Sequence, residues 1–276
     1  MKRVRNVSYM AICIIMCAFI LWGGLHVNGG NPIMGLGGSD AKAQAGGADS
    51  ETVQAISLIQ STKAQKVLDR IDEYPAELLE LLARNHETID FVADYPDWKD
   101  DGEEPVIDES AAAGSVPLFI QWDKRWGYKN YGDSMMGING CGPTCLSMVI
   151  VALTGDTDMT PYALATFSAA SGYYANESGT AWKLMNEGAQ QLGLMVHELP
   201  LDENTIRKTL ENGKPIIVSV TKGDFTSMGH YIVLTGVASD GTIIVNDPNS
   251  PLRSAKTWDL ERIMGQTRNL WAYWVE

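Results

Sequence analysis

Apolar residues recur at three- and four-residue steps through residues 51–97, which is the spacing of one face of an α-helix. The pattern predicts a first helical stretch, then a helix that Pro75 opens and that ends near Asn85. A third, short helix follows, which Pro96 is expected to stop. The apolar positions of these helices are Val53, Ile56, Ile59, Val67, Leu68, Ile71, Leu78, Leu79, Leu81, Leu82, Ile89, Phe91 and Val92.

In residues 116–276 the pattern changes from helices to strands. The expected helices span residues 143–153, 161–170, 180–192 and 203–212. The expected strands, rich in β-branched residues, span residues 215–221, 231–237, 242–247 and 269–274. Asp240-Gly241 is a strong hairpin signal between the second and third strands. Helices followed by an antiparallel sheet predict an α+β domain.

The chain begins with the basic sequence MKRVRN, followed by an uncharged apolar run of about 20 residues, long enough to cross a bilayer as a helix. The basic residues favour a cytoplasmic N-terminus, so residues 1–27 are predicted to be a signal anchor. A cleaved signal peptide is the alternative, since Ala43-Gln44-Ala45 has the form of a cleavage site. Both interpretations predict export. Residues 28–50, rich in Gly, Ala, Ser and Asn, predict a flexible linker.

The formal net charge of −13 is concentrated in one part of the chain. Residues 46–114 hold 17 acidic and five basic residues, whereas residues 115–276 hold 16 acidic and 12 basic ones. We interpret the acids of the predicted helices as a solvated face. Residues 98–115, acidic and then rich in Ala and Gly, predict a second linker. No basic patch suited to nucleic acid is present, so nucleic acid is not an expected partner.

Two of the four cysteines lie in the motif Gly140-Cys141-Gly142-Pro143-Thr144-Cys145, at the start of a predicted helix. The N–H groups and dipole at a helix start favour a thiolate, so Cys141 is the candidate nucleophile. A tight turn around a buried, inert cysteine is the structural alternative. Cys145 falls inside the predicted helix, where we expect a buried side chain. Since Cys13 and Cys17 lie in the apolar run, we do not expect a disulfide framework.

A histidine and an aspartate follow at the ends of two consecutive predicted strands. His230 precedes the second strand and Asp247 ends the third, 17 residues later. One hairpin can place the two side chains next to each other, where the carboxylate would orient the imidazole and stabilise its protonated form. Taken singly, a strand-edge histidine and an Asp-Pro-Asn turn are ordinary structural features. Their occurrence together, in the order Cys, His, Asp, points to nucleophilic catalysis.

Four blocks of this domain resemble the bacterial cysteine peptidase family thirty-nine, papain-superfamily enzymes whose best-known members cleave leader peptides at double-glycine sites. The blocks are Gln121–Trp126, Gly140–Thr144, Gly229–Leu234 and Asn246–Pro248. The resemblance implies a papain-like fold, with helices packed on an antiparallel sheet. It implies Cys141 as nucleophile, His230 as base and Asp247 as the orienting residue. It also implies that Gln121, together with the Cys141 backbone N–H, donates to the oxyanion.

The expected function is a membrane-tethered or secreted cysteine peptidase whose domain, residues 116–276, lies outside the cytoplasm. It would hydrolyse peptide bonds of a peptide or protein through an acyl-enzyme, without a metal or organic cofactor. No transporter accompanies the domain, so we do not expect an exporter's leader peptidase. The alternatives are a cell-wall peptide amidase or endopeptidase with the same triad, and a non-catalytic binding module of the same fold. In a third alternative the acidic helices are a structural scaffold and the peptidase is secondary.

Overall fold

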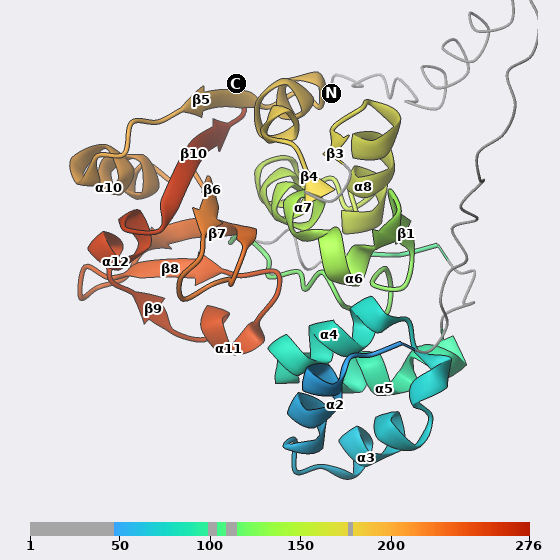
Figure 1. The fold of residues 1–276 in the computed structure, drawn as a ribbon. Helices are drawn as coiled ribbons and strands as arrows, with labels where there is room; N and C mark the ends of the chain where they lie inside the picture. Colours follow the sequence, from blue (N-terminus) through green and yellow to red (C-terminus); the bar gives the residue numbers. More distant parts are fainter. Residues whose placement is uncertain (1–46, 99–103, 109–114, 176–178) are drawn as a thin grey trace, which may run out of the picture. The chain divides into compact units, whose positions relative to one another are not determined.

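The computed structural model describes residues 47–98, 104–108, 115–175 and 179–276 (Figure 1). The predicted signal anchor, the cleavage-like Ala43-Gln44-Ala45 and nearly all of the first linker lie outside these residues. Within the described parts of the chain, no helix is both long enough and apolar enough to cross a membrane.

Residues 47–98 form a group of short helices, which we call the helical segment. Its helices are α2 (Ser50–Ser57), α3 (Thr62–Asp69), α4 (Ala76–Arg84) and α5 (Ile89–Trp98), with 3-10 turns at η1 (Ile71–Glu73) and η2 (His86–Thr88). The Ser61 side chain accepts from the Ala64 N–H and starts a new helix, so the first predicted stretch is divided into two. Pro96 lies inside α5 and does not stop it, which corrects the predicted end. Because Pro96 is near the end of α5, little of the helix depends on the hydrogen bond it lacks.

The apolar positions of the helical segment form a core of their own, as their spacing predicts. Leu78, Leu79 and Leu82 of α4 are fully buried. Two residues from the following domain, Tyr128 and Met135, belong to the same cluster. The helical segment is therefore packed against the domain rather than only connected to it.

Six antiparallel strands form the main sheet, in the order β5-β10-β6-β7-β8-β9. They are β5 (Met195–Glu198), β6 (Ile216–Thr221), β7 (Gly229–Val237), β8 (Ile243–Asn246), β9 (Thr257–Trp258) and β10 (Thr267–Trp274). The four predicted strands correspond to β6, β7, β8 and β10, and β5 and β9 complete the two edges. Gly241 between β7 and β8 has a φ of 82°, as the Asp240-Gly241 signal leads one to expect. The predicted α+β class, with an antiparallel sheet, is confirmed.

The remaining elements are helices and two small hairpins. The helices are α6 (Met136–Asn139), α7 (Cys141–Thr154), α8 (Pro161–Ala170), α9 (Ala189–Gln191), α10 (Glu203–Glu211), α11 (Pro251–Ser254) and α12 (Leu260–Met264), with a π-helical turn η4 at Leu184–Gly188. The hairpins pair β1 (Asn130–Tyr131) with β2 (Ser134–Met135) and β3 (Tyr174–Ala175) with β4 (Gly179–Thr180). The four helices predicted for this domain are present, although η4 interrupts the third.

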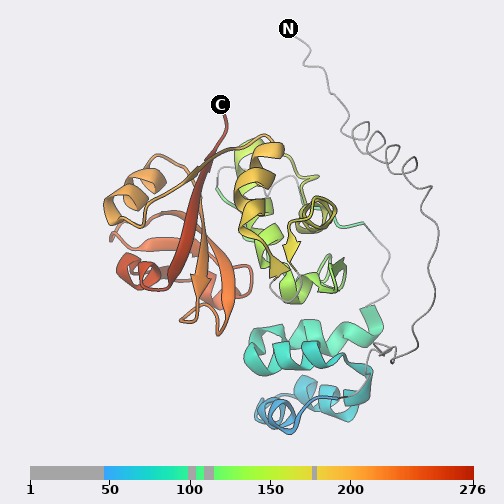
Figure 2. The ribbon, with the colours of Figure 1, turned by 45° about the horizontal axis from the view of Figure 1, so that its top comes forward.

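Alternate residues of the central strands enter two separate cores, because successive side chains of a strand point to opposite faces. On β7, Tyr231 and Val233 pack with α7 and α8, whereas Ile232 and Leu234 pack with α10 and α12. Figure 2 shows the sheet between the green helix α7 and the orange helix α10. Burial on both faces fixes the register of β7 and therefore the position of the residue at its start, His230.

Candidate active site

Cys141 is the first residue of α7, two residues earlier than the predicted start of this helix. Gly140 precedes it as the N-cap, and no side chain makes a capping hydrogen bond there. The helix dipole therefore acts on the Cys141 region without a competing side-chain oxygen. The Cys141 side chain is partly exposed, whereas the residues that follow, Gly142–Val151, are buried. Cys141 is thus the residue through which the N-terminal end of α7 reaches the surface.

His230 and Asp247 are hydrogen-bonded, with Nε2 of His230 at 2.8 Å from Oδ1 of Asp247. The pairing of β7 with β8, in which Val233 lies opposite Asn246, brings the two residues together. His230 is 7% exposed and Asp247 is fully buried. Since Asp247 occupies Nε2, Nδ1 is the ring nitrogen left to act on the Cys141 thiol.

The environment of His230 favours its protonated form. Burial lowers the pKa of His230, but the Asp247 carboxylate and the Cys141 thiol raise it by more, to about 10. Burial acts on Asp247 in the opposite sense and raises its pKa, while the positive charges of His230 and Arg253 bring that pKa below its usual value. His230 therefore holds a proton more strongly than a free imidazole, so a proton that the ring takes from a thiol is retained on it.

Arg253 is a member of this cluster that the sequence pattern did not reveal. Its Nε donates to Oδ2 of Asp247 at 2.5 Å. It lies on α11, which Ser250 caps through a hydrogen bond from the Arg253 N–H and in which Pro251 is near the first position. The Ser-Pro start of α11 is readable in the sequence. The direction of the Arg253 side chain is not, because it depends on how α11 packs on β8.

Gln121, the residue predicted to donate to the oxyanion, is engaged with the backbone of α6. Its Nε2 donates to the carbonyl oxygens of Gly137 at 2.9 Å and Ile138 at 3.1 Å. Its Oε1 is buried and has no partner among the described residues. The Gln121 N–H donates to the Pro248 carbonyl at 2.8 Å, which ties Gln121 to the turn that follows Asp247. Its position beside this turn and α6 is therefore fixed by hydrogen bonds, and its role at the oxyanion stays a prediction.

Cys145 is fully buried among the residues between α7 and the sheet, as expected from its place inside the helix. Burial raises the pKa of its thiol well above the usual value, with the nearby Cys141 acting in the same direction. A thiol of this kind is chemically inert. Gly142, between the two cysteines, allows the start of α7 to approach β4, because a Cβ at this position would lie 2.6 Å from the Cβ of Thr180.

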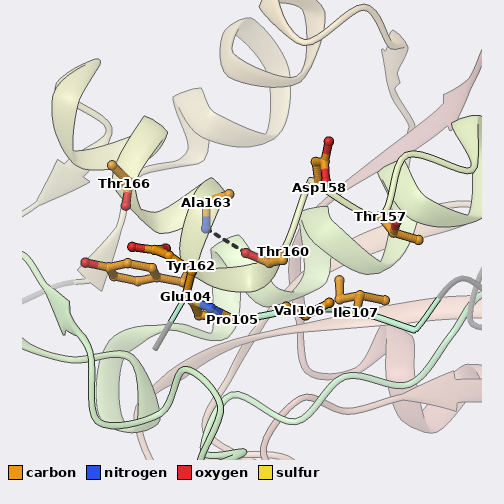
Figure 3. A pocket seen from close by; sticks show the side chains of 10 residues that line it. All are labelled: Glu104, Pro105, Val106, Ile107, Thr157, Asp158, Thr160, Tyr162, Ala163 and Thr166. Atoms are coloured by element: carbon orange, nitrogen blue, oxygen red, sulfur yellow. Dashed lines mark hydrogen bonds between the residues drawn. The ribbon is translucent and has the colours of Figure 1, made fainter. Parts of the chain in front are cut away.

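One open pocket of the described residues lies away from this cluster. It has a volume of about 570 Å³ and is lined by residues 104–107 and by side chains near the start of α8 (Figure 3). Thr160, which caps α8 by accepting from the Ala163 N–H at 3.1 Å, forms part of its wall. None of the four predicted site residues lines it. The described residues also contain no group of three side chains suited to hold a metal ion.

The sequence model of the Peptidase_C39 like family matches residues 114–275. The chain belongs to this family. The resemblance inferred from the four sequence blocks is therefore confirmed, and it supports a domain of the cysteine peptidase type.

This Peptidase_C39 like chain is similar to a solved structure, the crystal structure of the peptidase domain of Streptococcus ComA. ComA is described as a bi-functional ABC transporter involved in a quorum sensing pathway. The two are 25% identical, and the match covers 50% of this chain and 93% of that one, with a TM-score of 0.39. No curated protein matches the chain.

Proposed function

We propose that this chain is a cysteine peptidase that hydrolyses peptide bonds through Cys141, His230 and Asp247. The hydrogen bond of 2.8 Å between the buried His230 and Asp247, beside a partly exposed Cys141, is the observation that carries the proposal. The nucleophile is the first residue of α7, the base is the second residue of β7, and the orienting acid directly follows β8. The family supports the same class of chemistry.

In the proposed reaction, His230 takes the proton of the Cys141 thiol, and the thiolate attacks the peptide carbonyl carbon. The negative charge moves to the carbonyl oxygen, where the Cys141 N–H and the Gln121 amide would donate to it. The C–N bond then breaks, the protonated His230 gives its proton to the leaving amine, and an acyl-enzyme remains. Water, deprotonated by His230, hydrolyses the thioester and releases the acid.

For the oxyanion step, Gln121 has to redirect one N–H of its amide. That amide is bound to the carbonyls of Gly137 and Ile138 before substrate arrives. An incoming oxyanion is a stronger acceptor than a neutral carbonyl, so one of these two bonds can be exchanged for it. The fixed backbone of Gln121 keeps the side chain at the site during this exchange.

We also propose that residues 1–27 anchor the enzyme in a membrane, with the catalytic domain on the extracytoplasmic side, or direct its secretion. The basic N-terminus and the apolar run support this. A peptide or protein outside the cytoplasm is then the expected substrate. Protease accessibility of the domain in intact cells tests the location, and digestion only after cell lysis would contradict it.

The activity is tested by incubating the purified 276-residue chain with peptide and muropeptide libraries and identifying the products by mass spectrometry. Cleavage of peptides that is lost in Cys141→Ala supports the peptidase. Cleavage confined to muropeptides would reassign the same triad to a cell-wall amidase or endopeptidase. Binding of peptides without any cleavage would indicate a non-catalytic module of this fold.

A further inference from the structure

The helical segment contacts the turn that follows Asp247. Nδ2 of Asn85 donates to the backbone carbonyl of Asn249 at 2.7 Å and to its side-chain oxygen at 3.2 Å. Glu87 accepts from the Ser250 hydroxyl through Oε1 and from the Leu252 N–H through Oε2, the latter at 2.9 Å. Asn85 and Glu87 thus bond to three residues of the segment that leads from β8 into α11, namely Asn249, Ser250 and Leu252.

This turn is the element that fixes Asp247. The Asp247 N–H donates to Ser254 Oγ at 2.8 Å, and Asp247 Oδ1 accepts from the Asn249 N–H at 2.8 Å. Arg253, on α11, binds the other carboxylate oxygen. The four-residue helix α11 is too short to be stable by itself, since isolated short helices are marginal in water. Its order therefore depends on external contacts, of which Glu87 on the Leu252 N–H is one.

A second contact from the helical segment lies on the Gln121 side of the site. Phe91 packs against Gly137, where an added Cβ would come within 2.7 Å of the ring. The Gly137 carbonyl is one of the two acceptors of the Gln121 amide. The Phe91 carbonyl also accepts from Tyr128 Oη at 2.7 Å, and the two rings are stacked with centroids 4.3 Å apart. The helical segment thus supports the backbone near both Asp247 and Gln121.

We propose that Asn85 and Glu87 are positioning residues for Asp247, which makes the helical segment a working part of the active site rather than a spacer or an independent scaffold. The inference rests on the proposed peptidase function. Neither residue lies within 114–275, the part of the chain that matches the family. The positioning device is therefore a property of this chain's N-terminal extension, not of the family domain.

Three variants of the 276-residue chain separate positioning from a general loss of folding. Glu87→Ala removes both carboxylate oxygens that accept hydrogen bonds from the turn. Glu87→Gln retains one oxygen, which can still accept from either Ser250 or Leu252. Asn85→Asp keeps the oxygen that accepts from the Glu87 N–H at 3.1 Å but loses the donor to Asn249. Glu80→Gln is the matched control, because Glu80 is paired with Arg84 on its own helix.

The first measurement is hydrogen exchange of the peptide that covers residues 247–254, which needs no enzymatic activity. We expect exchange to be about tenfold faster in Glu87→Ala and Asn85→Asp, by analogy with the loss of a helix cap, and unchanged in Glu80→Gln. Glu87→Gln should be intermediate. Unchanged exchange in both Glu87→Ala and Asn85→Asp would overturn the inference, whether or not the wild-type chain cleaves peptides. If Glu87→Ala does not fold, unchanged exchange in both Asn85→Asp and Glu87→Gln would overturn the inference.

The second measurement is peptide turnover. We expect kcat to fall about tenfold in Asn85→Asp with KM within about twofold of wild type, since the turn acts through Asp247 and not on the substrate. A lower melting temperature with unchanged kcat would show a purely structural contact and overturn the positioning role. Absence of turnover in the wild-type chain would instead contradict the proposed function, and the exchange data would still decide the contact between the helical segment and the turn.

Discussion

The half-buried Arg253 and the fully buried Asp247 form an ion pair in which Nε of Arg253 is 2.5 Å from Oδ2 of the carboxylate. The other carboxylate oxygen is bonded to His230. Each oxygen of Asp247 therefore has its own cationic partner, and the carboxylate is held in one orientation. Asp247 remains ionised while fully buried because two positive groups, rather than one, compensate for its lost hydration.

Arg253→Gln should lower kcat by about tenfold, because Asp247 loses one of its two restraints and orients His230 less well. Arg253→Lys should recover only part of the loss, since an ammonium group does not reproduce the geometry of Nε. Steady-state kinetics on a peptide substrate measure the effect. Arg70→Gln is the control, because the Arg70 guanidinium pairs with Glu73 and Asp97 within the helical segment. Equal kcat in Arg253→Gln and wild type would show that Arg253 contributes to packing alone.

The pair of His230 and Asp247 should stabilise the fold most strongly in mildly acidic solution. The pKa of Asp247 is below its usual 3.8 in the fold, so its contribution is complete above about pH 3.8 and is lost as the pH falls further. The pKa of His230 is raised from 6.5 to about 10, so its contribution is complete below pH 6.5 and is lost as the pH rises towards 10.

The usual pKa values of Asp247 and His230 are 3.8 and 6.5. Between these two pH values, the free energy of unfolding of wild type should exceed that of Asp247→Asn by the largest amount. Urea denaturation at a series of pH values measures this difference. It should shrink towards both ends of the range. A difference that grows continuously up to about pH 10 would contradict a protonated His230 as the partner of Asp247.

Gln121→Ala should reduce kcat by about 10²-fold, the usual loss when one oxyanion donor is removed. It should leave KM almost unchanged, because the donor acts on charge that develops in the transition state. The variant should also be less stable, since the Gly137 and Ile138 carbonyls lose their donor. A fall in melting temperature with kcat unchanged would mean that Gln121 serves only these two carbonyls.

Cys145 should be dispensable for reactivity and important for packing. Cys145→Ala is expected to leave the alkylation rate of Cys141 unchanged and to destabilise the fold by about 1 kcal/mol through the cavity it creates. Cys145→Ser should cost more, about 1–3 kcal/mol, because its hydroxyl would be buried in an apolar core. Denaturant titrations and iodoacetamide kinetics measure the two effects separately. Loss of Cys141 alkylation in Cys145→Ala would contradict this division.

The sequence allowed prediction of those parts of the fold that depend on local pattern. The strands, the turn at Asp240-Gly241 and the closeness of His230 to Asp247 follow from alternation and hairpin length. The structure has these two side chains in direct contact, and their catalytic roles remain a prediction. The length of α5 was wrong, because Pro96 falls where a helix tolerates proline.

The parts that sequence reasoning missed depend on packing between distant segments. Glu87 and Leu252 are 165 positions apart, so no periodicity relates them. Arg253 lies on a helix of four residues, too short to produce a recognisable pattern. Contacts of this kind require the arrangement of β8, α11 and the helical segment in space, which a single sequence does not display.

The most direct test of the account is to treat the 276-residue chain with an electrophilic thiol probe near neutral pH and to locate the adduct by mass spectrometry. We predict rapid labelling at Cys141, strongly slowed in His230→Ala, and no labelling of Cys145 in the folded protein. Labelling of Cys141 at the same rate in His230→Ala, or labelling only at Cys145, would contradict Cys141 and His230 as nucleophile and base.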